Sequence, residues 1–169
     1  MEPFPQFDQL LDRLLDSQIE FVIIGGYASI IHGAIDATQD LDICCAILTH
    51  ENIQRLRNVL GDLHPRHRMT PQKLSFLEIP GEGGPPLQNL YLDTDWGTID
   101  ILTNVTGVGD FQRLKSAATR LTEQGKSYYV MSLGDLIKTK EALGREKDLR
   151  ALKQLRAIAA TCKQEKAED

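Results

Sequence analysis

Two carboxylates in the first quarter of this 169-residue chain have a spacing that could serve metal chemistry. Asp40 and Asp42 flank Leu41 in the segment DLDI. Alternate side chains of a β-strand point to the same face, so these carboxylates would lie about 7 Å apart on one face of a sheet. Like charges this close raise each other's pKa unless a cation lies between them. Mg²⁺ and Mn²⁺ take carboxylate oxygens as ligands and keep positions for phosphate and water. The spacing therefore indicates a divalent metal site.

A glycine pair precedes these carboxylates. The apolar run Phe21–Ile24 predicts a buried strand, and it ends at Gly25 and Gly26. Residues 27–31 predict a short helix that Gly33 closes. A glycine turn ahead of a helix is a place where phosphate can meet backbone N–H groups. Phosphate and a divalent ion together indicate nucleotide chemistry.

A third carboxylate would complete such a site. Asp100 lies between Ile99 and Ile101, so it also points to one face of a strand while its neighbours point to the other. Two metal ions about 3.5–4 Å apart could then hold the attacking and leaving oxygens of an in-line phosphoryl displacement. Asp93 and Asp95 are rival metal ligands, but the run Asp-Thr-Asp-Trp-Gly is typical of a turn.

The elements that must position these residues follow from the apolar patterns. Helical spacing predicts helices at 6–18, 27–31, 52–60, 110–122, 133–143 and 146–162. Extended patterns predict strands at 21–24, 41–48, 74–79 and 127–131 and a hairpin at 89–102, with loops at 63–72 and 80–86. Ser132 with Asp135 three residues later is a helix N-cap signature. We expect one α/β or α+β domain over residues 1–169: a mixed sheet flanked by helices, with a helical C-terminal part from about residue 133.

Composition narrows the class of protein. The chain is 41% hydrophobic and 25% charged with a net charge of −5, and no run is long enough to span a bilayer. Three cysteines, two of them adjacent, make no disulfide framework, so we expect the cytoplasm and no membrane. Acidic residues prevail up to residue 110 and basic ones after it. This asymmetry fits either a solvated basic helix surface or a phosphate-facing half opposite a metal-binding half. The overall acidity argues against a general nucleic-acid binder but leaves room for a local RNA groove.

Taken together, these motifs resemble the minimal nucleotidyltransferases of the polymerase-beta-like superfamily. That core motif is a Gly-Gly turn, a short helix, a strand carrying Asp-x-Asp and a later strand carrying a third Asp. Residues 25–43, GGYASIIHG with DLDI, look closest to small bacterial members of toxin–antitoxin and phage-defence systems. The segment LGDLIKTKEALGREKDLRAL (133–152) is also similar to their tail, which has a Lys on one helix and an Arg-x-Lys-Asp cluster opening the next.

The resemblance implies a nucleotide-binding part of the site. Gly25 and Gly26 would let the chain approach the triphosphate, and residues up to Ser29 would open the helix beneath it. Lys140 would contact triphosphate oxygens as a point charge. In the tail cluster, the corresponding residues are Arg145, Lys147 and Asp148. The substrate would be an NTP such as ATP.

The resemblance also implies a reaction. Asp40 and Asp42 would hold Mg²⁺ (or Mn²⁺), with two ions expected, and Asp100 would complete the metal site and serve as general base. The enzyme would transfer a nucleoside monophosphate from an NTP to a hydroxyl of a protein, an RNA or a small molecule, with release of pyrophosphate. A partner or antitoxin chain would be expected for a toxin–antitoxin member.

Two departures from the family pattern leave alternatives open. Asp36 stands where such proteins often have an Arg, and Ala151 where a second acid often follows the Lys-Asp pair. A catalytically inactive binding or regulatory module with the same fold is therefore the alternative. A dinucleotide-binding Rossmann unit does not fit, because there is one Gly-Gly pair instead of G-x-G-x-x-G.

Overall fold

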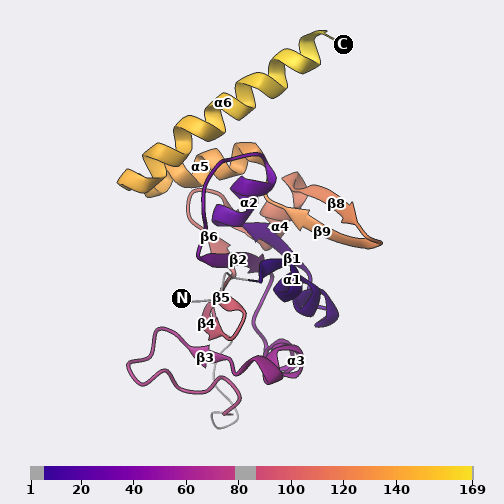
Figure 1. Ribbon diagram of the computed structural model, residues 1–169, viewed down its shortest axis with the longest axis vertical. Helices are drawn as coiled ribbons and strands as arrows, with labels where there is room; N and C mark the ends of the chain where they lie inside the picture. Colours follow the sequence, from indigo (N-terminus) through magenta and orange to yellow (C-terminus); the bar gives the residue numbers. More distant parts are fainter. Residues whose placement is uncertain (1–5, 79–86, 169) are drawn as a thin grey trace.

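The computed structural model describes residues 6–78 and 87–168, in which a seven-stranded mixed sheet runs in the order β3-β4-β5-β2-β1-β9-β8 (Figure 1). The strands are β1 (Phe21–Ile24), β2 (Asp40–Cys45), β3 (Arg66–His67), β4 (Asn89–Thr94), β5 (Gly97–Leu102), β8 (Thr119–Glu123) and β9 (Lys126–Val130). β2 is parallel to β5 and antiparallel to β1, and β1 is parallel to β9. Two short strands, β6 (Asn104–Val105) and β7 (Gly109–Asp110), pair separately. The mixed sheet predicted from the hairpin at 89–102 is confirmed.

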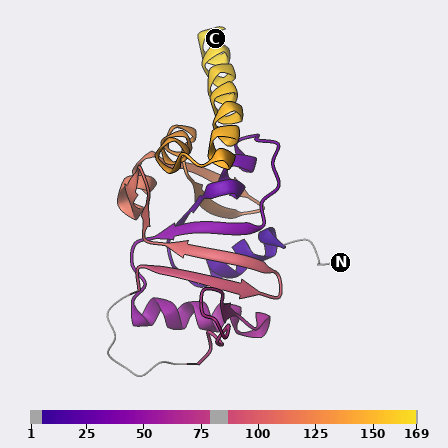
Figure 2. The ribbon, with the colours of Figure 1, turned by 90° about the vertical axis from the view of Figure 1, so that its left-hand side faces the viewer.

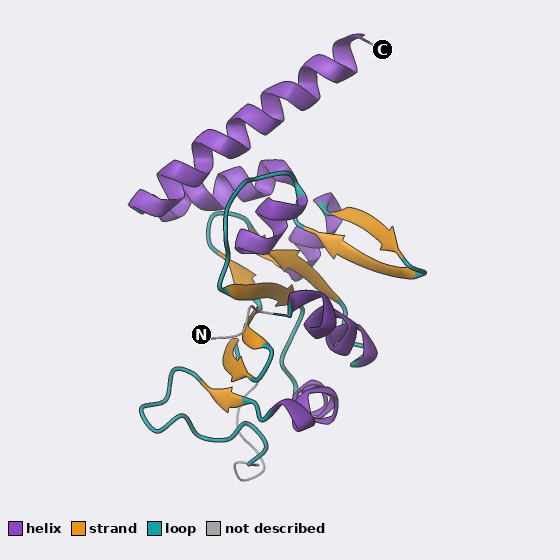
Figure 3. Cartoon of the chain, viewed as in Figure 1, coloured by secondary structure: helices purple, strands orange, loops and turns teal. Residues whose placement is uncertain are grey.

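Helices lie on both sides of this sheet (Figure 3). They are α1 (Phe7–Asp16), α2 (Gly25–Ile31), α3 (His50–Leu60), α4 (Phe111–Ala117), α5 (Leu133–Leu143) and α6 (Glu146–Glu168), with a 3₁₀ turn, η1, at Gly61–Leu63. In the part of the chain that the structure describes, no helix has the length and apolar character needed to cross a membrane.

The two faces of the central strands have different environments. Leu41 and Ile43 of β2 lie in register with Ile99 and Ile101 of β5, and all four are almost completely buried. Side chains of α1 and α3 pack on this face, where Leu14 and Leu56 line the same small gap as Ile43 and Ile101. Because side chains alternate along a strand, the opposite face carries Asp40, Asp42 and Asp100. Figure 2 shows the central strands side by side across the view, with α3 below them and α6 (yellow) rising above them.

The C-terminal helical region has the predicted boundaries at its start. The Ser132 hydroxyl accepts a hydrogen bond from the Asp135 N–H at 3.1 Å, so it caps α5. α5 ends at Gly144, whose φ of +61° is a conformation that glycine adopts at little cost. α6 then returns across α5, and its last turns extend beyond the rest of the molecule (Figure 1).

The strand predicted at 74–79 is wrong for the residues that the structure describes there, 74–78; residue 79 and the loop predicted at 80–86 lie outside them. Only Ser75 forms an isolated bridge, with Arg66. Leu74 is 46% exposed whereas Phe76 is 1% exposed, so the alternating apolar residues do not share a buried face. Phe76 instead anchors a turn, and its N–H donates to the Pro65 carbonyl at 2.9 Å. The predicted loop at 63–72 contains the short strand β3.

The helix predicted at 110–122 is too long. α4 stops at Ala117, because Ala118 has an extended backbone and residues 119–123 form the edge strand β8. A tight turn joins β8 to β9, and in it Gln124 and Gly125 both have positive φ, as a two-residue hairpin turn requires. The strand predicted at 41–48 also ends earlier, at Cys45.

Candidate active site

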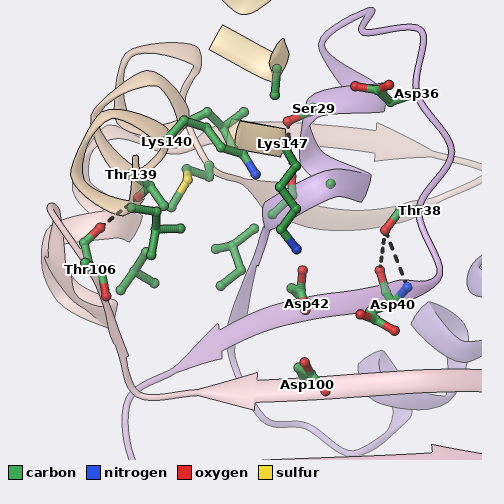
Figure 4. A pocket seen from close by; sticks show the side chains of 18 of the residues that line it. Ser29, Asp36, Thr38, Asp40, Asp42, Asp100, Thr106, Thr139, Lys140 and Lys147 are labelled. Carbon is green, nitrogen blue, oxygen red and sulfur yellow. Dashed lines mark hydrogen bonds between the residues drawn. The ribbon is translucent and has the colours of Figure 1, made fainter. Parts of the chain in front are cut away.

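The structure brings the three predicted carboxylates together. Asp42 of β2 is the register partner of Asp100 on the neighbouring parallel strand β5, and Asp40 lies two residues along β2 on the same face. Neighbouring strands are about 4.8 Å apart, so Asp42 and Asp100 are adjacent side chains. Figure 4 shows the three carboxylates on the floor of one cavity. All three side chains are half-buried.

Crowding and burial make this floor electrostatically unfavourable. Burial raises the pKa of Asp42, and the charges of Asp100 and Asp40 raise it further, to about 7, although Lys140 and Arg68 act in the opposite direction. Burial also raises the pKa of Asp100, against the hydrogen bond and positive charge of Arg68. An additional cation on this floor would relieve the repulsion.

Both predicted glycines are needed where the chain turns from β1 into α2. Gly25 has a φ of +65°, and a Cβ on it would lie 2.2 Å from Oδ2 of Asp42. A Cβ on Gly26 would lie 2.9 Å from the Thr38 hydroxyl. The glycine turn therefore leaves the room that the Asp42 carboxylate occupies. Ser29, predicted to bind nucleotide, is buried beside the same cavity, and its hydroxyl donates to the Gly25 carbonyl at 3.2 Å.

Cationic side chains of α5 and α6 form the opposite wall. The cavity has a volume of about 950 Å³ and lies between the carboxylate face and these helices. Lys140 of α5 and Lys147 of α6 extend into it from above, with Lys147 pointing toward Asp42 (Figure 4). Lys140 was predicted from the sequence. Lys147 was noted only as part of the tail cluster, which was the signal that could have included it in the site.

A buried carboxylate holds this wall in place. Asp148 is fully buried and accepts hydrogen bonds from Lys140 Nζ at 3.2 Å and Arg145 Nε at 2.6 Å. Burial by itself raises the pKa of Asp148, but the hydrogen bonds from Arg145 and Lys140 outweigh it and lower the pKa to about 2. Asp148 therefore connects the first turn of α6 to α5 and orients Lys140.

Sequence reasoning missed Arg68 entirely. It follows β3 in a segment interpreted as a loop, where neither periodicity nor a motif marked it. The guanidinium of Arg68 forms an ion pair with Asp100. The backbone N–H of Arg68 donates to the Tyr91 carbonyl at 3.0 Å. Nothing in the linear sequence connects residue 68 with residue 100; the pairing of β3 with β4 and of β4 with β5 does.

Other sequence-marked acids lie away from the floor of the cavity. Asp36 lies at its rim, where the Gln154 side chain donates to it at 3.3 Å from α6 (Figure 4). Asp93 binds Lys73 and the Thr98 hydroxyl, and Asp95 binds His64. Asp93 and Asp95, the rival metal ligands, therefore hydrogen-bond with side chains near the turn and do not face the cavity.

The three carboxylates are ligands that suit a hard divalent cation, but in this conformation their side chains do not converge on one point. Carboxylate oxygens are the ligands that Mg²⁺ and Mn²⁺ prefer, and the raised pKa of Asp42 reflects the unfavourable charge that such an ion would offset. Within residues 6–78 and 87–168, however, no three His, Cys, Asp or Glu side chains converge as a ready metal site. Asp100 is instead turned to Arg68.

Solved structures share this arrangement of elements. LnuA, a lincosamide antibiotic adenylyltransferase with bound lincomycin, superposes with a TM-score of 0.59 over 90% of this chain and 95% of its own, at 14% identity. ANT(2'')-Ia in complex with adenylyl-2''-tobramycin superposes with a TM-score of 0.54 over 96% of this chain and 90% of its own, at 12% identity. The chain has the nucleotidyltransferase fold. The resemblance seen in the sequence is confirmed at the level of the fold.

A third nucleotidyltransferase-fold neighbour comes from Thermotoga maritima. It is described as a candidate nucleotidyltransferase and superposes with a TM-score of 0.54 over 87% of this chain and 88% of its own, at 15% identity. No protein-family model matches the chain, and neither does any curated protein sequence.

The space that Gly25 leaves for Asp42 can be tested by substitution. We expect Gly25→Ala to lower the free energy of unfolding by about 3 kcal/mol, since it adds overpacking of about 1–3 kcal/mol to a left-handed backbone cost of about 1–2 kcal/mol. Gly125→Ala is the matched control, because Gly125 has a φ of +78°, close to that of Gly25, but a Cβ there would meet no atom within 4 Å. Urea unfolding measures both, and equal losses in the two variants would contradict the close approach.

The Asp148 network predicts a pH-dependent stability difference. Asp148→Asn should lower the free energy of unfolding by about 3 kcal/mol at pH 7, because it removes the buried carboxylate to which Lys140 and Arg145 donate. The native pKa of about 2 lies below the ordinary 3.8, so the carboxylate's contribution is complete above 3.8 and disappears as pH falls toward 2. Urea unfolding of the two proteins should therefore show a gap that narrows from pH 4 downward. The exposed Glu146→Gln, in the same helical turn, should show no such gap.

Proposed function

We propose that this protein is a divalent-metal-dependent nucleotidyltransferase that moves a nucleoside monophosphate from an NTP to a hydroxyl of a small molecule. The observation that carries the proposal is the apposition of three carboxylates and two lysines across one cavity of about 950 Å³. ATP is the first donor to test, because LnuA is an adenylyltransferase and the ANT(2'')-Ia complex holds an adenylylated product. Both neighbours' named ligands, lincomycin and tobramycin, favour a small-molecule acceptor over a macromolecule.

The carboxylate floor would hold the metal. Asp40 and Asp42 would bind Mg²⁺ or Mn²⁺, and Asp100 beside them would complete the set. When bound, the ion supplies positive charge to the phosphate oxygens and makes displacement at the α-phosphorus easier.

The basic wall would bind the triphosphate. Lys140 and Lys147 extend toward the carboxylate floor from above, and Gly25 and Gly26 present backbone without side chains at its edge. Because Asp148 holds Lys140 on one side, its ammonium group has a defined position. Charged side chains aimed at the phosphates stabilise the charge that develops on the leaving pyrophosphate.

Asp100 would remove the acceptor proton. Its Oδ1 binds Arg68, and its other oxygen has no hydrogen-bond partner among the described residues. In the transfer, the acceptor oxygen forms a bond to the α-phosphorus and the bond from that phosphorus to the β-bridging oxygen breaks. The hydroxyl proton passes to Asp100 and pyrophosphate leaves.

The remaining cavity wall indicates the kind of acceptor. Beyond the carboxylates it continues past β4, β5 and β6 toward α5 through uncharged side chains: Tyr91, Leu102, Asn104, Thr106, Thr139 and Leu143. This uncharged part of the wall suits a hydroxyl-bearing molecule with an apolar face, while Asp36, Arg145 and Arg150 also line the cavity. Protein or RNA acceptors, and a partner or antitoxin chain, stay predictions from the sequence resemblance.

Two observations favour the alternative, a nucleotide-binding module without transfer activity. Arg68 forms an ion pair with Asp100, the carboxylate that the reaction would use as its base. Asp36 stands where the family usually has an Arg. Titration calorimetry with ATP and Mg²⁺ separates this module from a protein that binds no nucleotide, and label transfer separates it from an enzyme.

The proposed chemistry predicts the loss of transfer without loss of fold. The double variant Asp40→Asn, Asp42→Asn should reduce label transfer from α-³²P-ATP by at least 10³-fold, since metal-dependent charge stabilisation is commonly of this size or larger. Its melting temperature should not fall, because the variant removes like-charge repulsion.

The matched control is Asp93→Asn, Asp95→Asn, which changes two acids of the same spacing that lie outside the cavity. It should keep transfer within a few-fold of the unsubstituted protein. Undiminished transfer by the Asp40 and Asp42 variant would exclude the mechanism, and ATP binding without any transfer across an acceptor panel would support the module.

A further inference from the structure

Arg68 is built into the edge of the carboxylate floor. Its backbone N–H donates to the Tyr91 carbonyl at 3.0 Å, and its guanidinium carbon lies 5.6 Å from the centre of the Tyr91 ring. Tyr91 on β4 is the register partner of Asp100 on β5, so the backbone that holds Arg68 is adjacent to the backbone that holds Asp100. The guanidinium is therefore placed by the sheet itself and not by a free surface loop.

The contacts of Arg68 match those expected of a cation that belongs to the site. Its Nη2 donates to Oδ1 of Asp100, and its side chain is only 30% exposed. Its Nε is buried and has no hydrogen-bond partner among the described residues. A buried donor without a partner points to a group that the chain does not itself supply.

The charge of Arg68 also changes how many metal ions the floor requires. A guanidinium keeps its charge at any relevant pH, so the pair with Asp100 is neutral. Asp40 and Asp42 then carry the two remaining negative charges, which one divalent ion balances. A second ion at Asp100 would have to share this carboxylate with a fixed positive charge at hydrogen-bond distance, which like-charge repulsion opposes.

We propose that Arg68 takes the place of a second metal ion, so that the site binds one divalent ion per nucleotide, at Asp40 and Asp42. Arg68 is thus a positioning residue: it orients Asp100 as the proton acceptor and leaves its second oxygen free for the acceptor hydroxyl. The inference rests on the proposed function, and it revises both the two ions expected from the sequence resemblance and the metal-ligand role proposed above for Asp100.

The number of bound ions tests the inference directly. Equilibrium dialysis with Mn²⁺ and α,β-methylene-ATP, an analogue that cannot transfer its nucleotidyl group, gives the Mn²⁺ bound per bound analogue after subtraction of an analogue-only blank. The unsubstituted protein should saturate at one ion, and Arg68→Gln should saturate at two. Arg68→Lys, which keeps the charge, should return the count to one. Arg66→Gln is the matched control, because it removes an exposed guanidinium two residues away.

Each outcome bears on one claim. Two ions in the unsubstituted protein, or one in a folded Arg68→Gln, would overturn the role of Arg68 while leaving nucleotidyl transfer intact. Should Arg68→Gln fail to fold, the counts for the unsubstituted and Arg68→Lys proteins still decide, since two ions in either would overturn the inference. A protein that binds neither Mn²⁺ nor the analogue would instead contradict the proposed function, as would unimpaired transfer by the Asp40 and Asp42 variant.

Discussion

The repulsion among Asp40, Asp42 and Asp100 is the constraint that organises this molecule. Three carboxylates on one half-buried face of a sheet are stable only with positive charge nearby, and burial alone already raises the pKa of Asp42. The fold supplies that charge from two directions. Arg68 approaches from the β3–β4 edge, and Lys140 and Lys147 approach from the C-terminal helices. In the proposed function, a nucleotide with its divalent ion would bind in the cavity between them, and the ion would add further positive charge beside the carboxylates.

The helical tail is therefore part of the site as well as of the fold. The buried carboxylate of Asp148 forms ion pairs with Lys140 and Arg145 and so joins the start of α6 to α5. Gln154 joins the same helix to the loop at Ile35 and Asp36, so α6 also closes the rim of the cavity. The site follows the charge asymmetry of the sequence, since its three carboxylates belong to the acidic first part and Lys140 and Lys147 to the basic last part. Composition left two explanations for the basic C-terminal part, a solvated helix surface or a phosphate-facing wall. The geometry favours the phosphate-facing wall for Lys140 and Lys147.

Much of the fold was predictable because its signals are local. The helical spacing of α1 and α3, the cap at Ser132 and the break between the helices at 133–143 and 146–162 each depend on neighbours in the sequence, and all were predicted. The errors arose where tertiary context decides. Phe76 lies in an apolar segment that predicted a strand. In the structure its side chain is buried as the anchor of a turn. Residues 119–123 became a strand because β9 offered an open edge and Gln124-Gly125 could form the turn between them.

The sequence by itself determined the carboxylates and glycines on which the proposed chemistry rests. Period-two alternation places Asp40, Asp42 and Asp100 on strand faces whatever the rest of the chain does, and the glycine pair marks a close approach. Only the tertiary structure decided which charges oppose these carboxylates. Strand order makes Asp42 and Asp100 neighbours and brings Arg68 to Asp100 across β4, and the packing of α6 on α5 brings Lys147 over Asp42. Such long-range pairings depend on register and on helix packing, which no local pattern encodes, because residues far apart in the sequence meet only when the sheet and helices assemble.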